Sequence, residues 1–460
     1  MIMNVFSLSE HDLIIRGKEN DGSKEDSFGV VLWEKDFDAL ELWASEQMRL
    51  EEKNRQLLPA EKTDSRKTPI RYDARRRGAL RVQNFVGIVQ LPSGDSLEIL
   101  PKITKKLDED SKERGRKILL SMLSAVHRFP HITFRRAGLD SGRMPLLEIF
   151  IICFLDDIGT LIRRGICSGY ATVEENLQCL RGKLLMPQHI RANSIHREHF
   201  YVSYDEYLPD RPKNRLLKTA LLHAHSISRN LESKRRCKRF LDVFEGVPFS
   251  SNIRDDFAAS ANLDRNTRHY RTPLFWSRLL LQGETPVPTS GNLGCTAVLF
   301  PMEKLFEAYV AIQVRRKLSL SGWAVTTQAK RVHLVEEHQN TPSYILKPDL
   351  LLERKSECVI ADTKWKHIVR KDDISSGDLY QLFAYSEKYM AQNTTRLSFL
   401  IYPQTDSFCE PLPDFHFYKN TAILRAIPFN LETDYCPLFE YLDGEVQPQC
   451  LQVNNTTEDA

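Results

Sequence analysis

The sequence predicts a mixed α+β protein that includes a C-terminal α/β domain. Short apolar segments that alternate with polar residues gather in residues 1–145, which indicates a β-rich N-terminal region. Longer helical segments dominate residues 146–290. Residues 291–431 combine a strong helix with short apolar runs typical of buried strands. We therefore expect three folded parts, in this order, followed by a polar tail over residues 432–460.

The N-terminal region starts with two segments that alternate like strands, Asp12–Ile15 and Phe28–Trp33. Phe37–Arg55 has the composition of a helix. Leu58–Arg77 is polar and basic and contains two prolines, which is typical of a linker or a mobile loop.

A β-hairpin is predicted next. Leu80–Leu91 alternates, Pro92–Asp95 supplies the turn, and Ser96–Ile103 forms the returning strand.

Helices account for most of the middle of the chain. They are predicted over Gly115–Val126, Pro145–Gly165, the segment from Asn214 onward, His223–Val243 and Pro273–Gln282. The segment Gly283–Gly294 is rich in Gly, Pro, Thr and Ser and is the best candidate for a domain boundary. The α/β domain then begins with a helix over Met302–Leu318 and ends near Leu431.

Composition indicates a soluble globular protein. The chain has 460 residues, 42% of them hydrophobic and 27% charged, and no run approaches eighteen consecutive apolar residues, so no transmembrane helix is expected. The first residues lack the pattern of a signal peptide. Nine scattered cysteines without a CxxC pair argue against a zinc site and a disulfide framework, and favour reduced thiols in the cytoplasm.

The segment with the clearest chemistry is Lys347–Lys366, which reads KPDLLLERKSECVIADTKWK. Asp362 and Lys364 are two apart at the end of an apolar run, so in a strand they point to the same face. If the two apolar runs of this segment pair as a hairpin, Asp349 comes beside them. Two carboxylates and an ammonium group then share one patch, which is the PD-(D/E)xK pattern of metal-dependent nucleases.

The residue types suit that chemistry. Carboxylate oxygens are ligands that Mg²⁺ prefers, and two aspartates leave positions open for water and a phosphate oxygen. A lysine can orient the attacking water or stabilise the charge of the transition state. The alternative for Asp349, Asp362 and Lys364 is a salt-bridged hairpin with ordinary surface charges.

Two further features have the same two interpretations. Gln381 and Tyr385 are four apart on a predicted helix and share a face, as in the QxxxY pair that such nucleases often carry, or they belong to an ordinary amphipathic helix. Glu307 stands within an apolar run of the Met302–Leu318 helix. It could reach the metal through a water, or be a solvated helix residue.

Clusters of basic residues are candidates for contacts with DNA phosphates, although each could also be a solvated face. They are Arg75–Arg77, Arg135–Arg136, Arg163–Arg164, Lys234–Arg236 and Lys238–Arg239. No GxxxxGK[ST] phosphate loop, GxGxxG or HExxH motif is present, so the chain shows no nucleotide-hydrolysing machinery of its own.

The order of several motifs resembles the McrC family, the nuclease subunits of McrBC-type modification-dependent restriction systems. The similar segments are FVGIVQLPSGDSLEILPKI at Phe85–Ile103, Leu180–Lys183, Tyr204–Glu206 with Asn214–Lys218, Leu305–Glu307, LKPDLLL, ADTKW, LYQLFAY and Leu400–Pro403. Together they span roughly residues 80 to 403. The first seventy-odd residues fit the family less clearly.

The resemblance implies a PD-(D/E)xK restriction-endonuclease-like domain that cuts double-stranded DNA with Mg²⁺, together with a separate AAA+ GTPase of the McrB type that reads the methylated base. By the same resemblance, Asp349 and Asp362 hold Mg²⁺, Lys364 is the catalytic lysine, and Gln381 and Tyr385 support the site. To these we add Glu307 as a candidate catalytic residue and Thr363 as a candidate metal ligand. We also expect the hairpin of residues 80–103 to help contact the partner.

Two other functions stay open at this stage. About 290 residues lie outside the nuclease block, which would suit a non-catalytic adaptor that activates a partner GTPase. A stand-alone nuclease in defence or repair is the other alternative.

Overall fold

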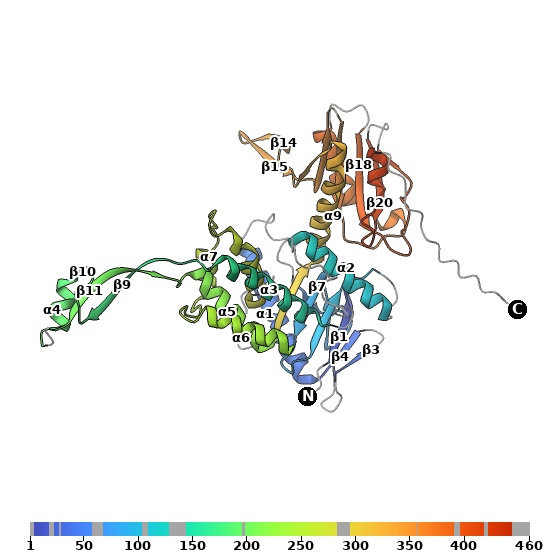
Figure 1. Cartoon of the computed structure of the whole chain (residues 1–460). Helices are drawn as coiled ribbons and strands as arrows, with labels where there is room; N and C mark the ends of the chain where they lie inside the picture. Colours follow the sequence, from blue (N-terminus) through green and yellow to red (C-terminus); the bar gives the residue numbers. More distant parts are fainter. Residues whose placement is uncertain are drawn as a thin grey trace.

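The computed structural model describes residues 4–17, 23–26, 29–57, 68–103, 109–127, 144–195, 198–282, 295–355, 357–390, 396–417 and 422–443. Figure 1 shows the N-terminal and middle parts of the chain in one body, the C-terminal part in a second body, and a long arm that projects from the first. Within the described ranges, no helix has both the length and the apolar character needed to cross a bilayer. The expected boundary segment, residues 283–294, and the basic pair Arg135–Arg136 lie outside the described residues.

Two mixed sheets form the N-terminal region. The four-stranded sheet has the order β1 (Val5–Ser9), β8 (Ser96–Leu100), β7 (Phe85–Gln90), β12 (Thr296–Pro301). The five-stranded sheet has the order β3 (Lys24–Asp26), β4 (Gly29–Leu32), β2 (Leu13–Arg16), β6 (Ala79–Val82), β5 (Ile70–Tyr72). Helix α1 (Glu34–Leu57) packs on the five-stranded sheet, with Phe37, Leu40 and Trp43 buried in their shared core.

The predicted hairpin is confirmed as β7 paired antiparallel with β8, but its first strand is shorter than expected. Residues 80–91 form two strands in two different sheets. The strand is interrupted at Gln83 and Asn84, whose backbone groups bond to other segments. The Gln83 N–H donates to the Pro69 carbonyl (2.8 Å), and the Asn84 carbonyl accepts from the Met302 N–H (2.9 Å). The segment read as a linker also contains strand β5.

Strands β7 and β8 are interior strands with almost every residue buried. The expected contribution of this hairpin to a partner contact stays a prediction, and the burial of both strands leaves the turn between them as its accessible part. At Gly87 (φ 137°) the neighbouring strand β12 comes so close that a Cβ would lie 2.1 Å from the Val298 carbonyl oxygen. This close packing explains why glycine is needed there.

Helices make up the core of the middle region. They are α2 (Glu109–His127), α3 (Leu146–Arg164), α5 (Pro212–Ile227), α6 (Leu231–Val243), α7 (Ile253–Ala259) and α8 (Arg271–Gln282), with a 3₁₀ turn at Arg268–Tyr270. Their apolar faces join one buried cluster with the sheet of β7 and β12.

The helical stretch predicted over His223–Val243 is interrupted at residues 228–230. The carboxylate of Glu148, a buried residue of α3, accepts hydrogen bonds from the Ser228 hydroxyl and from the N–H groups of Arg229 and Asn230. Asn230 then caps α6 by accepting from the N–H groups of Glu232 and Ser233. A buried acceptor on another helix thus ends α5 and sets the start of α6.

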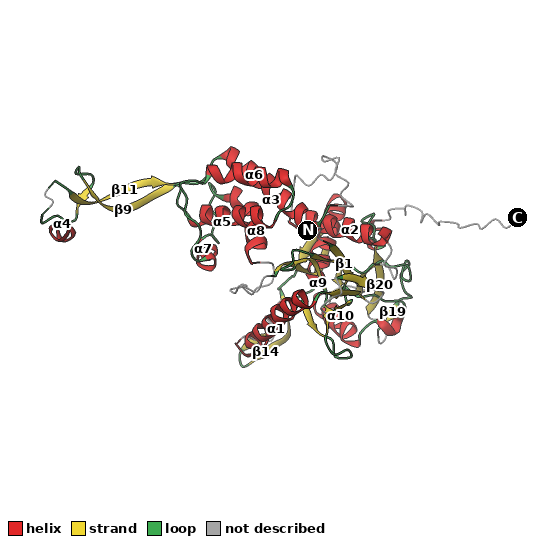
Figure 2. Cartoon of the chain, turned by 90° about the horizontal axis from the view of Figure 1, so that it is seen from below, coloured by secondary structure: helices red, strands yellow, loops and turns green. Residues whose placement is uncertain are grey.

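The arm is the largest difference from the prediction of a mostly helical middle region. It consists of β9 (Gly169–Leu177), β10 (Lys183–Leu184), a short helix α4 (Met186–Ala192) and β11 (Phe200–Leu208). Strands β9 and β11 pair antiparallel over nine residues and leave the body as a narrow ribbon, as both Figure 1 and Figure 2 show. Most of its side chains are exposed, so no continuous apolar face marked these strands in the sequence.

The C-terminal part is built on a six-stranded mixed sheet. Its order is β13 (Ala324–Thr327), β16 (Leu350–Arg354), β17 (Glu357–Thr363), β18 (Arg396–Pro403), β20 (Ala422–Phe429), β19 (Phe415–His416). Strands β14 (Val332–His338) and β15 (Thr341–Leu346) form a separate ribbon. The helices are α9 (Met302–Leu318), α10 (Ser376–Tyr389) and α11 (Leu438–Asp443), with 3₁₀ turns at Ser319–Ser321 and Lys371–Asp373.

Helices α9 and α10 cover opposite faces of this sheet. Residues of α9 share a core with Leu350, Ala361 and Ile401, whereas residues of α10 share a second core with Ile360 and Leu400. The sequence placed the start of a tail at residue 432. The fold instead continues to residue 443, because Cys436, Leu438 and Phe439 are buried in the core beside α9.

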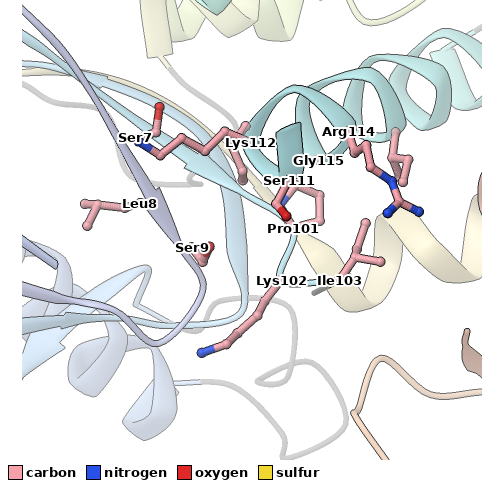
Figure 3. Close-up of a pocket in the computed structure, with 12 residues that line it drawn as sticks. Ser7, Leu8, Ser9, Pro101, Lys102, Ile103, Ser111, Lys112, Arg114 and Gly115 are labelled. Atoms are coloured by element: carbon pink, nitrogen blue, oxygen red, sulfur yellow. The ribbon is translucent and has the colours of Figure 1, made fainter. Parts of the chain in front are cut away.

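A small cavity lies between the four-stranded sheet and the start of α2, and ion pairs lie at its edge. Figure 3 shows its lining, in which Lys112 lies beside Ser7 and Arg114 lies on the side of Ile103. Lys112 pairs with Glu25 and Arg114 pairs with Glu432, each at 2.7 Å. The cavity holds about 20 Å³, which is room for a single water, so we regard it as structural.

The Glu148 contacts give a testable prediction about the fold. We expect Glu148→Ala to destabilise the chain by about 2–3 kcal/mol, because buried donors at Ser228, Arg229 and Asn230 would lose their acceptor. Urea unfolding of the full chain measures this loss. Glu245→Ala, at an exposed position, is the control, and an equal loss in both variants would contradict the assignment.

Candidate active site

The hairpin predicted from the sequence brings the two aspartates together. Strands β16 and β17 pair antiparallel with Leu350 opposite Ala361, so Asp349, which precedes Leu350, lies beside Asp362. The N–H and the hydroxyl of Thr363 both donate to Asp349 Oδ2 at 2.8 Å. These two hydrogen bonds fix the Asp349 carboxylate against the end of β17.

Lys364 follows directly on β17 and is held by three oxygen atoms. Its Nζ lies 2.7 Å from Asp362 Oδ2, 3.4 Å from Asp378 Oδ1 and 3.4 Å from Gln381 Oε1. The Lys364 N–H donates to the Ile401 carbonyl of β18 at 2.9 Å, which fixes the backbone from which this side chain extends.

Glu307 reaches the site through a residue that the sequence did not suggest. The Gln328 Nε2 donates to Glu307 Oε1 (2.7 Å) and to Asp349 Oδ1 (2.9 Å), so one amide bridges both carboxylates. Gln328 has a left-handed backbone (φ 49°), and its N–H donates to the Asp349 carbonyl at 3.1 Å. An unusual backbone conformation at a functional site is a recurring observation in proteins.

Gln381 and Tyr385 lie on the face of α10 that is turned toward the site. The Gln381 Nε2 donates to the Tyr385 hydroxyl at 2.7 Å, and that hydroxyl donates to the Lys347 carbonyl at 3.1 Å. The pair therefore links Lys364 to the backbone just before Asp349. Tyr385 also belongs to the core under α10. The role of this pair at a metal site stays a prediction.

Burial and, to a smaller extent, repulsion between carboxylates raise the pKa values of the acidic residues in the site. Burial raises the pKa of Asp362 to about 7, and the nearby charge of Asp349 adds to this rise. Burial and the charge of Glu307 raise the pKa of Asp349 to about 6. Burial lowers the pKa of Lys364, but the charges of Asp362 and Asp378 outweigh burial and raise it overall. Lys364 therefore stays positively charged, whereas Asp349 and Asp362 lose their protons less readily than ordinary aspartates.

The donor set fits a hard divalent cation, although the side chains do not enclose one as they stand. In the part of the chain that the structure describes, no group of three or more His, Cys, Asp or Glu side chains is gathered closely enough to hold a metal ion. Nitrogen donors of Gln328 and Lys364 lie against these carboxylates instead. Oxygen ligands and mutual repulsion favour a cation such as Mg²⁺ among Glu307, Asp349 and Asp362.

All of the predicted site residues thus come together, and two further residues join them. They are Glu307, Asp349, Asp362, Thr363, Lys364, Gln381 and Tyr385, with Gln328 and Asp378 added by the structure. Asp378 had a signal in the sequence, since it precedes Gln381 by three residues on the same helix face. Gln328 had none, because it belongs to no motif. The role of Thr363 as a metal ligand stays a prediction.

The basic clusters lie away from these residues in the chain. Arg75–Arg77 are exposed between β5 and β6, Arg163 and Arg164 end α3, and Lys234–Arg236 with Lys238–Arg239 belong to α6. Arg236 is paired with Asp156 at 2.7 Å.

Comparison with known proteins identifies the family. Residues 80–403, well over half of the chain, match the family model described as McrBC 5-methylcytosine restriction system component. The chain belongs to this family. The structure accordingly has the mixed α/β architecture expected from the resemblance to McrC. A comparison with curated proteins gives no match.

Solved structures of the McrBC system have a similar fold. A chain of the refined half-complex from a tetradecameric assembly of Thermococcus gammatolerans McrB AAA+ hexamers with bound McrC matches with a TM-score of 0.62 and 19% identity, covering 93% of this chain and 95% of that chain. A chain of the cryo-EM structure of the Thermococcus gammatolerans McrBC complex matches with a TM-score of 0.46 and 20% identity, covering 72% of this chain and 90% of that chain. The first likeness shows that the fold is shared along nearly the whole length.

The raised pKa values of the aspartates predict how the effect of Mg²⁺ on the thermal stability of the chain should depend on pH. In the unfolded chain an aspartate titrates near about 3.9, so ionising Asp349 and Asp362 in the folded chain costs stability as the pH rises to about 7. A bound cation offsets this cost only where the carboxylates are ionised. We expect Mg²⁺ to raise the unfolding temperature clearly at about pH 8 and little at about pH 5.5.

Thermal unfolding with and without Mg²⁺ at both pH values measures this effect. Asp349→Asn is the matched control and should reduce the Mg²⁺ response at about pH 8. Equal responses at the two pH values would mean that these carboxylates do not bind the cation.

Proposed function

We propose that this chain is a Mg²⁺-dependent DNA endonuclease whose C-terminal part is a PD-(D/E)xK domain. The observation that carries the proposal is the meeting of Asp349, Asp362 and Lys364 at the ends of the paired strands β16 and β17. Helices α9 and α10 cover the two faces of their sheet and bring Glu307 and Gln381 to the same point. This arrangement supplies oxygen ligands and a fixed ammonium group, as phosphodiester hydrolysis requires.

Asp349, Asp362 and Thr363 would hold Mg²⁺, which when bound activates a water and neutralises charge on the scissile phosphate. Lys364, a permanent cation, is suited to orient the attacking water or to stabilise the negative charge of the transition state. Gln381 and Tyr385 fix the position of the Lys364 side chain relative to the backbone just before β16. Glu307 has the position to contact the cation through a water.

The partner and the substrate follow from the family. The solved relative with the shared fold is bound to McrB AAA+ hexamers. We infer that this chain acts with an AAA+ GTPase of the McrB type, stimulates its GTP hydrolysis, and cuts methylcytosine-containing double-stranded DNA. We also infer that it works in the cytoplasm. The sequence has no nucleotide-binding loop, which supports a division of labour between two chains.

DNA cleavage by the complex tests the nuclease assignment. The full chain with its partner, GTP and Mg²⁺ should cut methylated plasmid, and Asp362→Ala should reduce the rate by at least about a hundredfold, because one metal ligand and the closest Lys364 partner are lost. Glu357→Ala, an exposed position at the start of the same strand, should cut at the normal rate. Normal cutting by Asp362→Ala would refute the assignment.

The arm favours a second role, activation of the partner GTPase. It is a narrow ribbon with exposed apolar side chains, a surface that monomeric proteins usually avoid. These side chains are Tyr170, Leu180, Met186, Ile190, Ile195 and Tyr207, with exposed fractions from 53% to 86%. We infer that the arm binds the GTPase, so that the two roles belong to separate parts of one chain.

A charge placed on the tip of the arm tests this role. Met186→Glu combined with Ile190→Glu should lower GTPase stimulation at least about tenfold, because burying an unpaired carboxylate in an interface is costly. Mg²⁺ stabilisation of the chain should remain. Leu42→Glu, at a similarly exposed apolar position on α1, is the control. Unchanged stimulation by the arm variant would exclude the arm as the contact.

A further inference from the structure

The ammonium group of Lys364 lies between two carboxylates that come from different elements. Asp362 belongs to β17 and is 2.7 Å away, whereas Asp378 belongs to the first turn of α10 and is 3.4 Å away. The Asp362 side chain is 3% exposed and the Asp378 side chain is 19% exposed. Lys364 therefore has a tight partner in the interior and a looser partner nearer to solvent.

Asp362 has two competing tasks in the proposed reaction. Its Oδ2 is the atom closest to Lys364 in this structure, and the same carboxylate is a proposed ligand of the divalent cation. A cation at this carboxylate would attract the oxygen away from Lys364 and repel the ammonium group. Like charges held close together in a buried site repel strongly, so Lys364 then needs another anion.

Asp378 is fixed where it can meet that need. Its N–H donates to the side chain of Ser375, the N-cap of α10, at 3.1 Å. Gln381 lies one turn further along the same face, directs its Oε1 to Lys364, and is itself held by Tyr385. The helix therefore presents a carboxylate and an amide oxygen to Lys364, independently of strand β17.

The strand that accepts a hydrogen bond from the Lys364 backbone also carries a buried tyrosine. Tyr402 of β18 is fully buried, and its hydroxyl has no hydrogen-bond partner among the described residues. Burial raises the pKa of Tyr402, and the charge of Asp378 adds to this rise. Interactions between charges are stronger in such a buried environment than in open solvent.

We propose that Asp378 is a positioning residue that takes over the Lys364 ammonium group from Asp362 when the divalent cation binds. This inference rests on the proposed nuclease function and extends it to a residue outside the PD-(D/E)xK motif. Asp378 keeps Lys364 at the site while Asp362 turns to the cation. Without Asp378, Lys364 stays on Asp362 and competes with the cation for the same oxygen.

This competition predicts a coupling that a double-mutant cycle can measure. Mn²⁺ serves as the probe, and its binding to the full chain is followed by electron paramagnetic resonance. Asp378→Asn keeps the size of the side chain and removes its charge, and we expect it to weaken Mn²⁺ binding about fivefold. In a Lys364→Met background, which has no ammonium group to compete, Asp378→Asn should have little effect.

Two control variants show whether Mn²⁺ binds at Asp362 and whether loss of any nearby carboxylate weakens its binding. Asp362→Ala should abolish the Mn²⁺ signal of this site. Asp372→Asn removes an exposed carboxylate just before α10 and should bind Mn²⁺ as the unaltered chain does.

The outcomes separate this inference from the proposed function. Equal weakening by Asp378→Asn in both Lys364 backgrounds, or no weakening in either, would overturn the role of Asp378 while leaving the nuclease proposal standing. Failure of the unaltered chain to bind Mn²⁺ in a manner that depends on Asp362 would overturn both.

Discussion

Repulsion between neighbouring carboxylates is the constraint on which the C-terminal part of this protein depends. Asp362 is buried and lies near Glu307 and Asp349, which are half-buried, and this arrangement is unfavourable unless donors or a cation offset the charges. The structure supplies three such donors, which are Thr363 on β17, Lys364 directly after β17 and Gln328 after β13. The register of the strands and the position of α10 are tied to this balance.

Helix α9 connects this charged site to the rest of the molecule. It begins directly after β12 of the N-terminal sheet, where the Asn84 side chain donates to Glu303 at 3.1 Å, and its middle carries Glu307. It is buried against both parts of the chain. A second connection lies nearby, because the Trp365 indole, next to Lys364 in sequence, donates to the buried carboxylate of Glu10. Residues before position 80, which fit the family less clearly, thus contact the element that carries the site.

Sequence reasoning succeeded where local pattern and chemistry agree. The paired runs of residues 347–366, the bounds of α9 and the shared face of Gln381 and Tyr385 followed from periodicity and from the needs of a metal site. The rest depends on pairing over long distances. Strand β12 lies some two hundred residues from its partner β7, and Gln328 enters the site only through the unusual backbone conformation after β13. The arm escaped notice because its strands, most of whose side chains are exposed or half-buried, have no continuous apolar face to reveal them.

The arm also has a consequence for the life of the protein in a cell. If the arm binds a partner, as proposed above, a copy made without that partner would carry an exposed ribbon of aromatic and aliphatic side chains, with Ile195 86% exposed. Surfaces of this kind are what chaperones and proteases recognise on incomplete proteins. Supply of the two subunits in matched amounts would then protect the chain from turnover. An unassembled copy would be removed before it could accumulate, and assembly itself would set how much of the chain persists.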